Sequence, residues 1–91
     1  MASYVIAYDL MKPGQKYENV QEVISTISGN DNVEIQKSVW LVKTTLSPTK
    51  IRECFSSVLD KNDSFFVCEL RKNFRINSDA YTDMKVDRDI F

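Results

Sequence analysis

The amino-acid sequence predicts a single α+β domain, and three observations support this class. The chain has 91 residues, which is enough for one domain and too few for two. Its apolar residues form short runs rich in β-branched and aromatic side chains, which alternate with two segments of helical spacing. Hydrophobic residues make up 43% and charged residues 27% of the chain, which is typical of a folded globular protein rather than a disordered one.

The first half of the chain predicts a strand, a helix and a β-hairpin. The apolar run at residues 4–10 has no polar alternation, so it predicts a strand that is buried on both faces and ends at the Pro13-Gly14 turn. Helical spacing follows, with apolar residues at Tyr17, Val20, Ile24 and Ile27. Residues 33–46 are too long for one ordinary strand, and we expect two strands joined by a tight turn or bulge at residues 36–38.

The second half predicts a helix, a strand and a C-terminal extension. Ser47 followed by Pro48 is a typical helix start, with a hydroxyl N-cap before a proline. Apolar spacing continues this helix through Ile51, Cys54, Phe55, Val58 and Leu59. Residues 64–70 predict the next strand, and residues 71–76 are either a fifth strand or an extended tail. Residues 77–91 have few apolar side chains and no clear period, so we expect them to order only against a partner.

The element order β-α-β-β-α-β predicts a ferredoxin-like antiparallel sheet with two helices on one face, over residues 1–78, followed by an acidic C-terminal tail at residues 79–91. The second face of such a sheet is polar in a monomer, but here apolar residues occupy both faces of three strands. In the third strand, for example, Leu41 and Val42 point in opposite directions. We expect a homodimer that packs its sheets face to face; the alternative is a tail that folds back over the sheet.

The composition excludes several kinds of chemistry. The chain has no histidine, which excludes serine and cysteine triads that use histidine, and histidine-ligated zinc or haem. Cys54 and Cys68 are too few for a four-cysteine zinc site, and we expect both to be reduced thiols packed in the core. The net charge of −1 gives no general attraction to nucleic acid. No segment is long enough for a membrane span and no signal peptide precedes the first strand, so we expect a cytoplasmic protein without a membrane partner.

Four short segments carry a resemblance to a known superfamily through their order and spacing. They are Tyr4-Val-Ile-Ala-Tyr-Asp-Leu10, Gln36-Lys-Ser-Val-Trp40, Leu46-Ser-Pro-Thr-Lys-Ile51 and Asp63-Ser-Phe-Phe-Val-Cys-Glu-Leu70. Together they resemble the superfamily of CRISPR-associated protein two and the VapD-type toxins. The stretch from Asp9 to Tyr17 is most similar to the SinR-like branch found in bacteria and phages. The resemblance covers residues 3–70 and implies a ferredoxin-like fold and a dimer built through the open sheet faces.

The resemblance also implies a role for Asp9 as a catalytic and metal-binding residue. In the superfamily the aspartate that ends the first strand lies near the dimer axis, and its two copies are proposed to hold one Mg²⁺ that activates water against an RNA or DNA phosphodiester. This chemistry is reasonable, because Mg²⁺ prefers oxygen ligands and keeps several of its waters. The alternative is structural, since an aspartate before a turn commonly accepts hydrogen bonds from backbone N–H groups.

Other residues are candidates for contacts with nucleic acid and with a second subunit. The candidate phosphate contacts are Lys12, Lys16, Lys37, Arg71, Lys72 and Arg75. Phe74 lies among the last three, a combination that suits single-stranded nucleic acid, although a solvated edge is the alternative. The candidate dimer-interface residues are Tyr8, Trp40 and Phe66.

Two functions therefore remain open. The first is a metal-dependent nuclease that acts on RNA or DNA as a homodimer with magnesium. The second is a non-catalytic dimeric binding module that scaffolds nucleic acid, binds a nucleotide, or inhibits a host protein as a phage-type inhibitor does. The second is motivated by the near-neutral charge and the acidic tail, which could dock on a basic protein partner.

Overall fold

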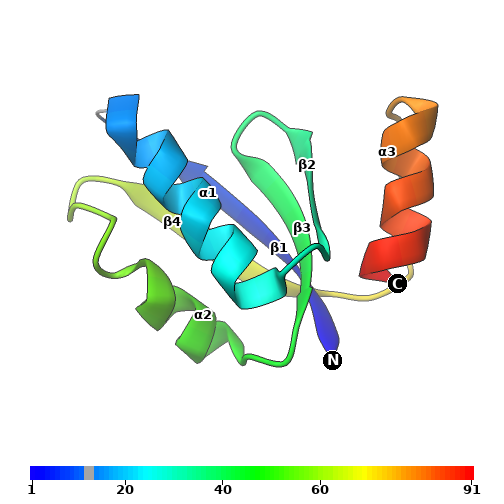
Figure 1. Ribbon diagram of the computed structural model, residues 1–91, viewed down its shortest axis with the longest axis horizontal. Helices are drawn as coiled ribbons and strands as arrows, with labels where there is room; N and C mark the ends of the chain where they lie inside the picture. Colours follow the sequence, from blue (N-terminus) through cyan, green and yellow to red (C-terminus); the bar gives the residue numbers. More distant parts are fainter. Residues whose placement is uncertain (12–13) are drawn as a thin grey trace.

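The computed structural model describes residues 1–11 and 14–91. The candidate phosphate contact Lys12 and the Pro13 of the predicted Pro13-Gly14 turn therefore lie outside the described residues. The described part contains a four-stranded antiparallel sheet with the strand order β2-β3-β1-β4 (Figure 1). The elements are β1 (Ala2–Asp9), α1 (Gly14–Ser28), β2 (Asn32–Gln36), β3 (Val39–Thr44), α2 (Pro48–Phe55), β4 (Ser64–Leu70) and α3 (Ala80–Lys85), which continues into a π-helical turn at Val86–Ile90.

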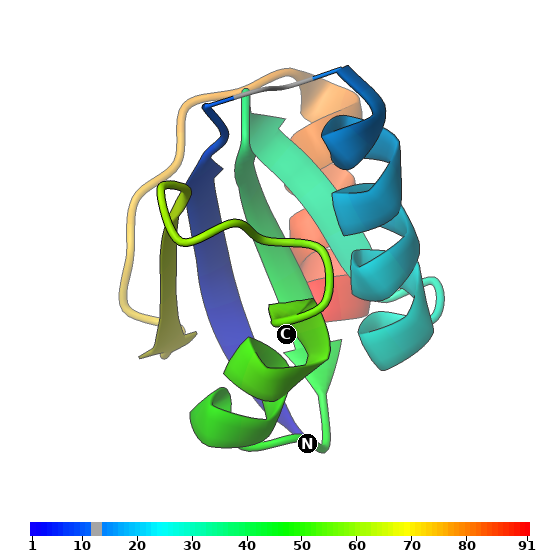
Figure 2. The same ribbon diagram turned by 90° about the vertical axis from the view of Figure 1, so that its left-hand side faces the viewer.

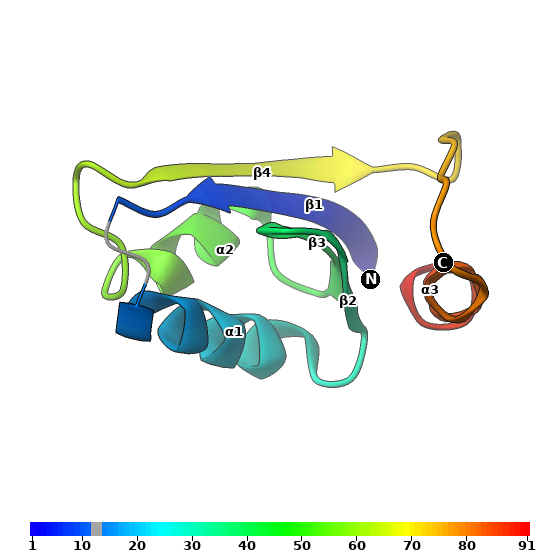
Figure 3. The ribbon, with the colours of Figure 1, turned by 90° about the horizontal axis from the view of Figure 1, so that it is seen from above.

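The predicted α+β class is confirmed. The order β-α-β-β-α-β is present, but it continues into a third helix, so the chain departs from the plain six-element ferredoxin arrangement. Figure 3 shows α1 and α2 on one side of the sheet, with α3 on the other side beside β2. One face is therefore covered by α1 and α2, and the C-terminal residues cover part of the other face.

The larger core lies between the sheet and the first two helices. Alternation along β1 directs Tyr4, Ile6 and Tyr8 toward this side, where all three are buried. They pack with Val42 of β3, Val20 and Ile24 of α1, and Ile51 and Phe55 of α2. The predicted start of α2 is confirmed, because the Ser47 hydroxyl accepts a hydrogen bond from the Lys50 backbone N–H and Pro48 is the first helical residue.

The predicted hairpin is also confirmed. Its turn at residues 37–38 places Ser38 at a φ of 64°, and the pairing of β2 with β3 shifts register between Glu34 and Gln36, which marks a bulge. The Glu34 carboxylate accepts a hydrogen bond from the Ser38 N–H, which supports this left-handed conformation. Of the two alternatives for residues 71–76, the extended tail is the one observed, because no strand is present there.

A smaller core lies on the second face, where the C-terminal residues fold back. Val86 and Ile90 are buried there against Val33 of β2 and Leu41 of β3. The Ser3 hydroxyl donates a 2.6 Å hydrogen bond to the Ile90 carbonyl, which fixes the last turn to β1. The expectation that residues 77–91 order only against a partner is therefore wrong, and the alternative of a tail that folds back holds for the β2–β3 side of the sheet. Figure 2 shows α3 behind this side.

Both cysteines were expected in the core, and both are exposed. Cys54 lies in the last turn of α2, whose only buried residues are Ile51 and Phe55. Cys68 lies on the second face of β4, beyond the reach of the C-terminal cover. An apolar stripe in the sequence therefore overestimates burial where the helix is short.

The buried position of Ile90 gives a test of the C-terminal packing. Ile90→Ala should lower the free energy of unfolding by about 2–4 kcal/mol, because it removes buried methyl groups and leaves a cavity. Asp87→Ala is the matched control, since Asp87 is exposed in the same turn and should change stability by less than about 0.5 kcal/mol. Urea unfolding measures both values, and equal stabilities for the two variants would contradict the observed packing.

Candidate functional site

Asp9, the residue that carries the predicted chemistry, ends β1 and pairs in register with Ser64 of β4. Alternation along β1 places it on the same side as Val5 and Ala7, opposite the face that α1 and α2 cover. It is exposed, and within the described residues no hydrogen bond or ion pair engages its carboxylate. The structural alternative, a carboxylate that accepts hydrogen bonds from the turn, is therefore not observed in the described part of the chain.

Asp9 by itself is too small a donor set for a metal ion. Among the described residues, no group of three or more aspartate, glutamate or cysteine side chains is placed to hold a metal. The donor chemistry is suitable for Mg²⁺, but the ion takes about six oxygen ligands, so one carboxylate needs further ligands such as waters, substrate phosphate oxygens or a second carboxylate.

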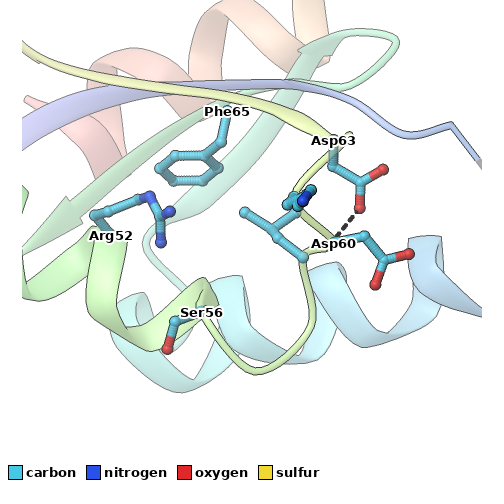
Figure 4. A pocket seen from close by; sticks show the side chains of 7 residues that line it. Arg52, Ser56, Asp60, Asp63 and Phe65 are labelled. Carbon is cyan, nitrogen blue, oxygen red and sulfur yellow. Dashed lines mark hydrogen bonds between the residues drawn. The ribbon is translucent and has the colours of Figure 1, made fainter.

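A different aspartate is held firmly at the same end of the sheet. Asp63, just before β4, accepts hydrogen bonds from the Met11 N–H at 2.9 Å and from the Asp60 N–H at 2.8 Å (Figure 4 shows the second). It also accepts one from the Lys16 ammonium at 2.5 Å, and Lys16 contacts the Asp60 carboxylate at the same distance. We call these four residues the Asp63 clamp; it joins the start of α1, the end of β1 and the turn before β4.

The electrostatics of the clamp follow from these contacts. The Asp63 side chain is not exposed, and the hydrogen bonds from Lys16 and from the two backbone N–H groups lower its pKa to about 2. The hydrogen bonds that Lys16 donates to Asp60 and to Asp63 raise the pKa of Lys16. Lys16 was predicted to contact phosphate, but its side chain is only 17% exposed and its charge is already paired. This role of Asp63 was not predicted from the sequence, where the residue was noted only as the start of the segment 63–70.

The other candidate basic residues do not form one surface with Asp9. Lys37 is exposed in the hairpin turn, where the Ser38 carbonyl accepts from the Tyr8 N–H, so it lies at the Asp9 end of the sheet. Arg71 and Lys72 follow Leu70, which pairs with Ser3 at the opposite end. The exposed basic residues of the extended segment 71–76 that directly follows β4 are Arg71, Lys72 and Arg75. Any contact they make with a phosphate is separate from chemistry at Asp9.

The three candidate interface residues lie on different faces of the sheet. Tyr8 is buried under α1 beside Tyr17, and its hydroxyl accepts a 3.0 Å hydrogen bond from the Trp40 indole. Burial raises the pKa of Tyr8. Tyr8 and Trp40 therefore pack in the larger core and not on the open face, where they were expected. Phe66 lies on the opposite face and is 59% exposed.

An uncovered area remains on the β1–β4 half of the second face. Phe66 pairs directly with Ala7, and Cys68 pairs with Val5, so these side chains share the face on which Asp9 lies. The C-terminal residues reach Val5 and Leu41 but leave Phe66 and Cys68 exposed. We call Ala7, Phe66 and Cys68 the open patch; Asp9 lies at its edge.

No protein-family model matches the sequence. Among the described residues, no helix combines the length and the apolar character that crossing a bilayer requires. Asp9, the open patch and the Asp63 clamp are the features of the described residues that bear on function.

The clamp predicts a particular dependence of stability on pH. The folded-state pKa of Asp63, about 2, is below the ordinary value of 3.8, so its stabilisation is complete above about pH 4 and is lost as the pH falls toward 2. Asp63→Asn should lower the melting temperature at pH 7 and weaken the further fall between pH 4 and 2. Thermal unfolding at a series of pH values measures this effect.

Asp60→Asn is the control for this prediction, because the Asp60 side chain is 65% exposed and, among the described residues, its carboxylate accepts only from Lys16. It should lower the melting temperature less than Asp63→Asn and keep most of the acid dependence. Identical acid profiles for wild type and Asp63→Asn would show that the clamp does not contribute to stability.

Proposed function

We propose that the chain is a metal-dependent nuclease that cleaves RNA or DNA phosphodiester bonds as a homodimer. The observation that carries this proposal is the position of Asp9, an exposed carboxylate without a partner among the described residues, at the edge of the open patch. In this proposal the core is a ferredoxin-like unit with a C-terminal helix, and two such units pack through their open patches.

The register of the sheet supports the role of Asp9 in such a dimer. In a two-fold contact in which Phe66 packs against its own copy, the symmetry axis would pass near the Ala7–Phe66 pair. Asp9 lies two residues further along β1, which is a distance of about 7 Å along a strand. The two Asp9 carboxylates would then lie on the same surface near the axis, where they could share one cation.

Each residue in this proposal has a limited task. The two Asp9 carboxylates supply oxygen ligands, and a bound Mg²⁺ would supply Lewis acidity and an activated water. Phe66 and its copy exclude water from the contact beside the carboxylates. Lys37, in the exposed hairpin turn at this end, is placed to neutralise a substrate phosphate.

A second function, a non-catalytic dimeric binding module, is supported by a different observation. Arg71, Lys72 and Arg75 are exposed around the half-buried Phe74, in a segment that has no strand partner and begins at the end of the sheet opposite Asp9. Cations around an aromatic ring suit a single-stranded nucleic acid held without cleavage. The exposed Asp87 on the C-terminal turn is the remaining argument for a basic protein partner.

The nuclease proposal is tested by Asp9→Asn, which removes the carboxylate and keeps its size. In assays with Mg²⁺ or Mn²⁺ on single-stranded RNA and duplex DNA, we expect the rate to fall by about 10²-fold or more, because loss of a second-shell partner alone costs 10–100-fold. Asp87→Asn is the control and should keep wild-type activity. Equal rates for wild type and Asp9→Asn, or no wild-type cleavage, would reject the nuclease and leave the binding module.

The dimer is tested through Phe66. Wild type should show a mass near twice the 10.5 kDa of one chain in light scattering at about 100 μM. Phe66→Glu should be a folded monomer, because the exposed ring contributes little to the fold and a buried charge opposes association. Tyr81→Glu is the control, since Tyr81 is 65% exposed on α3, away from the open patch, and should stay dimeric. A monomeric wild type would contradict the shared Asp9 site.

A further inference from the structure

A cavity of about 330 Å³ lies on the helix side of β4, opposite the face that carries Asp9. The end of α2, the segment that connects α2 to β4, and the start of β4 form its walls (Figure 4). Its lining includes Arg52, Ser56, Lys61 and Phe65, together with Asp60 and Asp63. Two cationic residues, a serine and an aromatic residue therefore border one concave space.

The electrostatic balance of this cavity favours an anion. Lys16 offsets one of the two negative charges of Asp60 and Asp63, because it contacts both carboxylates at 2.5 Å, and Arg52 and Lys61 together exceed the charge that remains. The Asp63 side chain is also not exposed, so it presents little charge to a ligand. Arg52 and Lys61 have no ion-pair partner in the part of the chain that the structure describes. The two exposed cations thus remain available for a ligand.

The aromatic wall is held in place from behind. The Phe65 ring packs against the buried Phe55 ring, with their centroids 4.8 Å apart and an angle of 42° between the planes. Phe65 is partly exposed and also lines the cavity, where Figure 4 shows it near the Arg52 side chain. An aromatic ring that is fixed by the core can stack on a planar base with little loss of side-chain freedom.

We propose that this cavity binds one nucleotide, with the base against Phe65 and the phosphate on Arg52 and Lys61. Arginine suits this role because its planar guanidinium donates two parallel hydrogen bonds to phosphate oxygens. The Ser56 hydroxyl donates to the Glu53 carbonyl at 2.7 Å, so toward a ligand it acts as an acceptor, for example from a hydroxyl of the sugar. The volume is at the low end of the range for small-molecule sites and is too small for several nucleotides.

This site is independent of the proposed nuclease reaction. It lies within one chain, on the other face of the sheet from Asp9, and it requires neither a metal ion nor a second subunit. A free mononucleotide and a single residue of an RNA strand present the same chemistry, a base next to a phosphate. Separate titrations with a free mononucleotide and with a short RNA strand distinguish these two possible ligands.

The test is a titration of the ¹⁵N-labelled full chain, followed by backbone amide chemical shifts. The ligands are AMP, adenosine and a five-residue oligoadenylate, each raised to about 10 mM to detect millimolar affinities. We expect saturable shifts in residues 52–65 with AMP or the oligoadenylate, and at least about 10-fold weaker binding of adenosine, which lacks the phosphate. Saturation by AMP identifies a free nucleotide as sufficient, and saturation by the oligoadenylate alone identifies a strand as the source.

Variants separate the assigned residues from general surface charge. Arg52→Gln should weaken binding by about 10-fold or more, because it removes the bidentate contact with the phosphate. Lys50→Gln is the matched control in α2, since Lys50 pairs with Glu53 and does not line the cavity, and it should bind as wild type does. Phe65→Leu keeps an apolar side chain against Phe55 but loses stacking, and it should also weaken binding.

Three results would overturn the proposal. They are the absence of saturable shifts in residues 52–65 with every ligand, adenosine binding as tight as that of AMP, and equal weakening by Arg52→Gln and Lys50→Gln. The amide spectrum of each variant shows whether it is folded, so a loss of structure cannot be mistaken for a loss of binding. Asp9→Asn should leave the titration unchanged, which keeps this result separate from the outcome of the nuclease assay.

Discussion

The contact between Asp63 and Lys16 is the interaction on which both candidate sites depend. Asp63 accepts hydrogen bonds from Lys16 in α1, from Met11 after β1 and from Asp60 in the turn before β4. It therefore fixes the relative positions of three chain segments at one end of the sheet. Asp9 lies two residues before Met11, so the clamp holds the strand end that presents it. The same carboxylate, neutralised by Lys16, leaves the neighbouring cavity cationic rather than acidic.

The second face of the sheet shows how a small chain covers part of an apolar surface and leaves part of it open. The C-terminal turn buries Val86 and Ile90 against the β2–β3 half, which removes the strongest reason for an obligatory dimer. The β1–β4 half remains uncovered around Phe66. A dimer through this half buries a smaller area than a complete sheet face would, so a reversible association fits the structure better than an obligate one.

Local sequence signals were sufficient for most elements but not for contacts between distant residues. Ser47-Pro48, the apolar run of β4 and the break at residues 36–38 act through nearby backbone geometry, and all three predictions are confirmed. The last helix was missed, although Asp79 caps it through the Thr82 N–H, because Val86 and Ile90 are too few for a visible period. Asp63 was missed because its partners, Met11 and Lys16, are about 50 residues away in the chain.

The placement of the cations limits how a nucleic acid could approach Asp9. Lys16 is paired with two carboxylates, and Arg71 and Lys72 follow the opposite end of β4. Among the described residues, the exposed cations known to lie at the Asp9 end are therefore Lys37 in the hairpin turn and Lys61 in the turn before β4. Two Asp9 carboxylates near a symmetry axis would repel a phosphate unless a divalent cation lay between them. In the proposed nuclease the metal is therefore needed for substrate binding as well as for chemistry. Phosphate binding at such a site depends more on the metal than it does at a site surrounded by arginine residues, because the chain supplies little positive charge near Asp9.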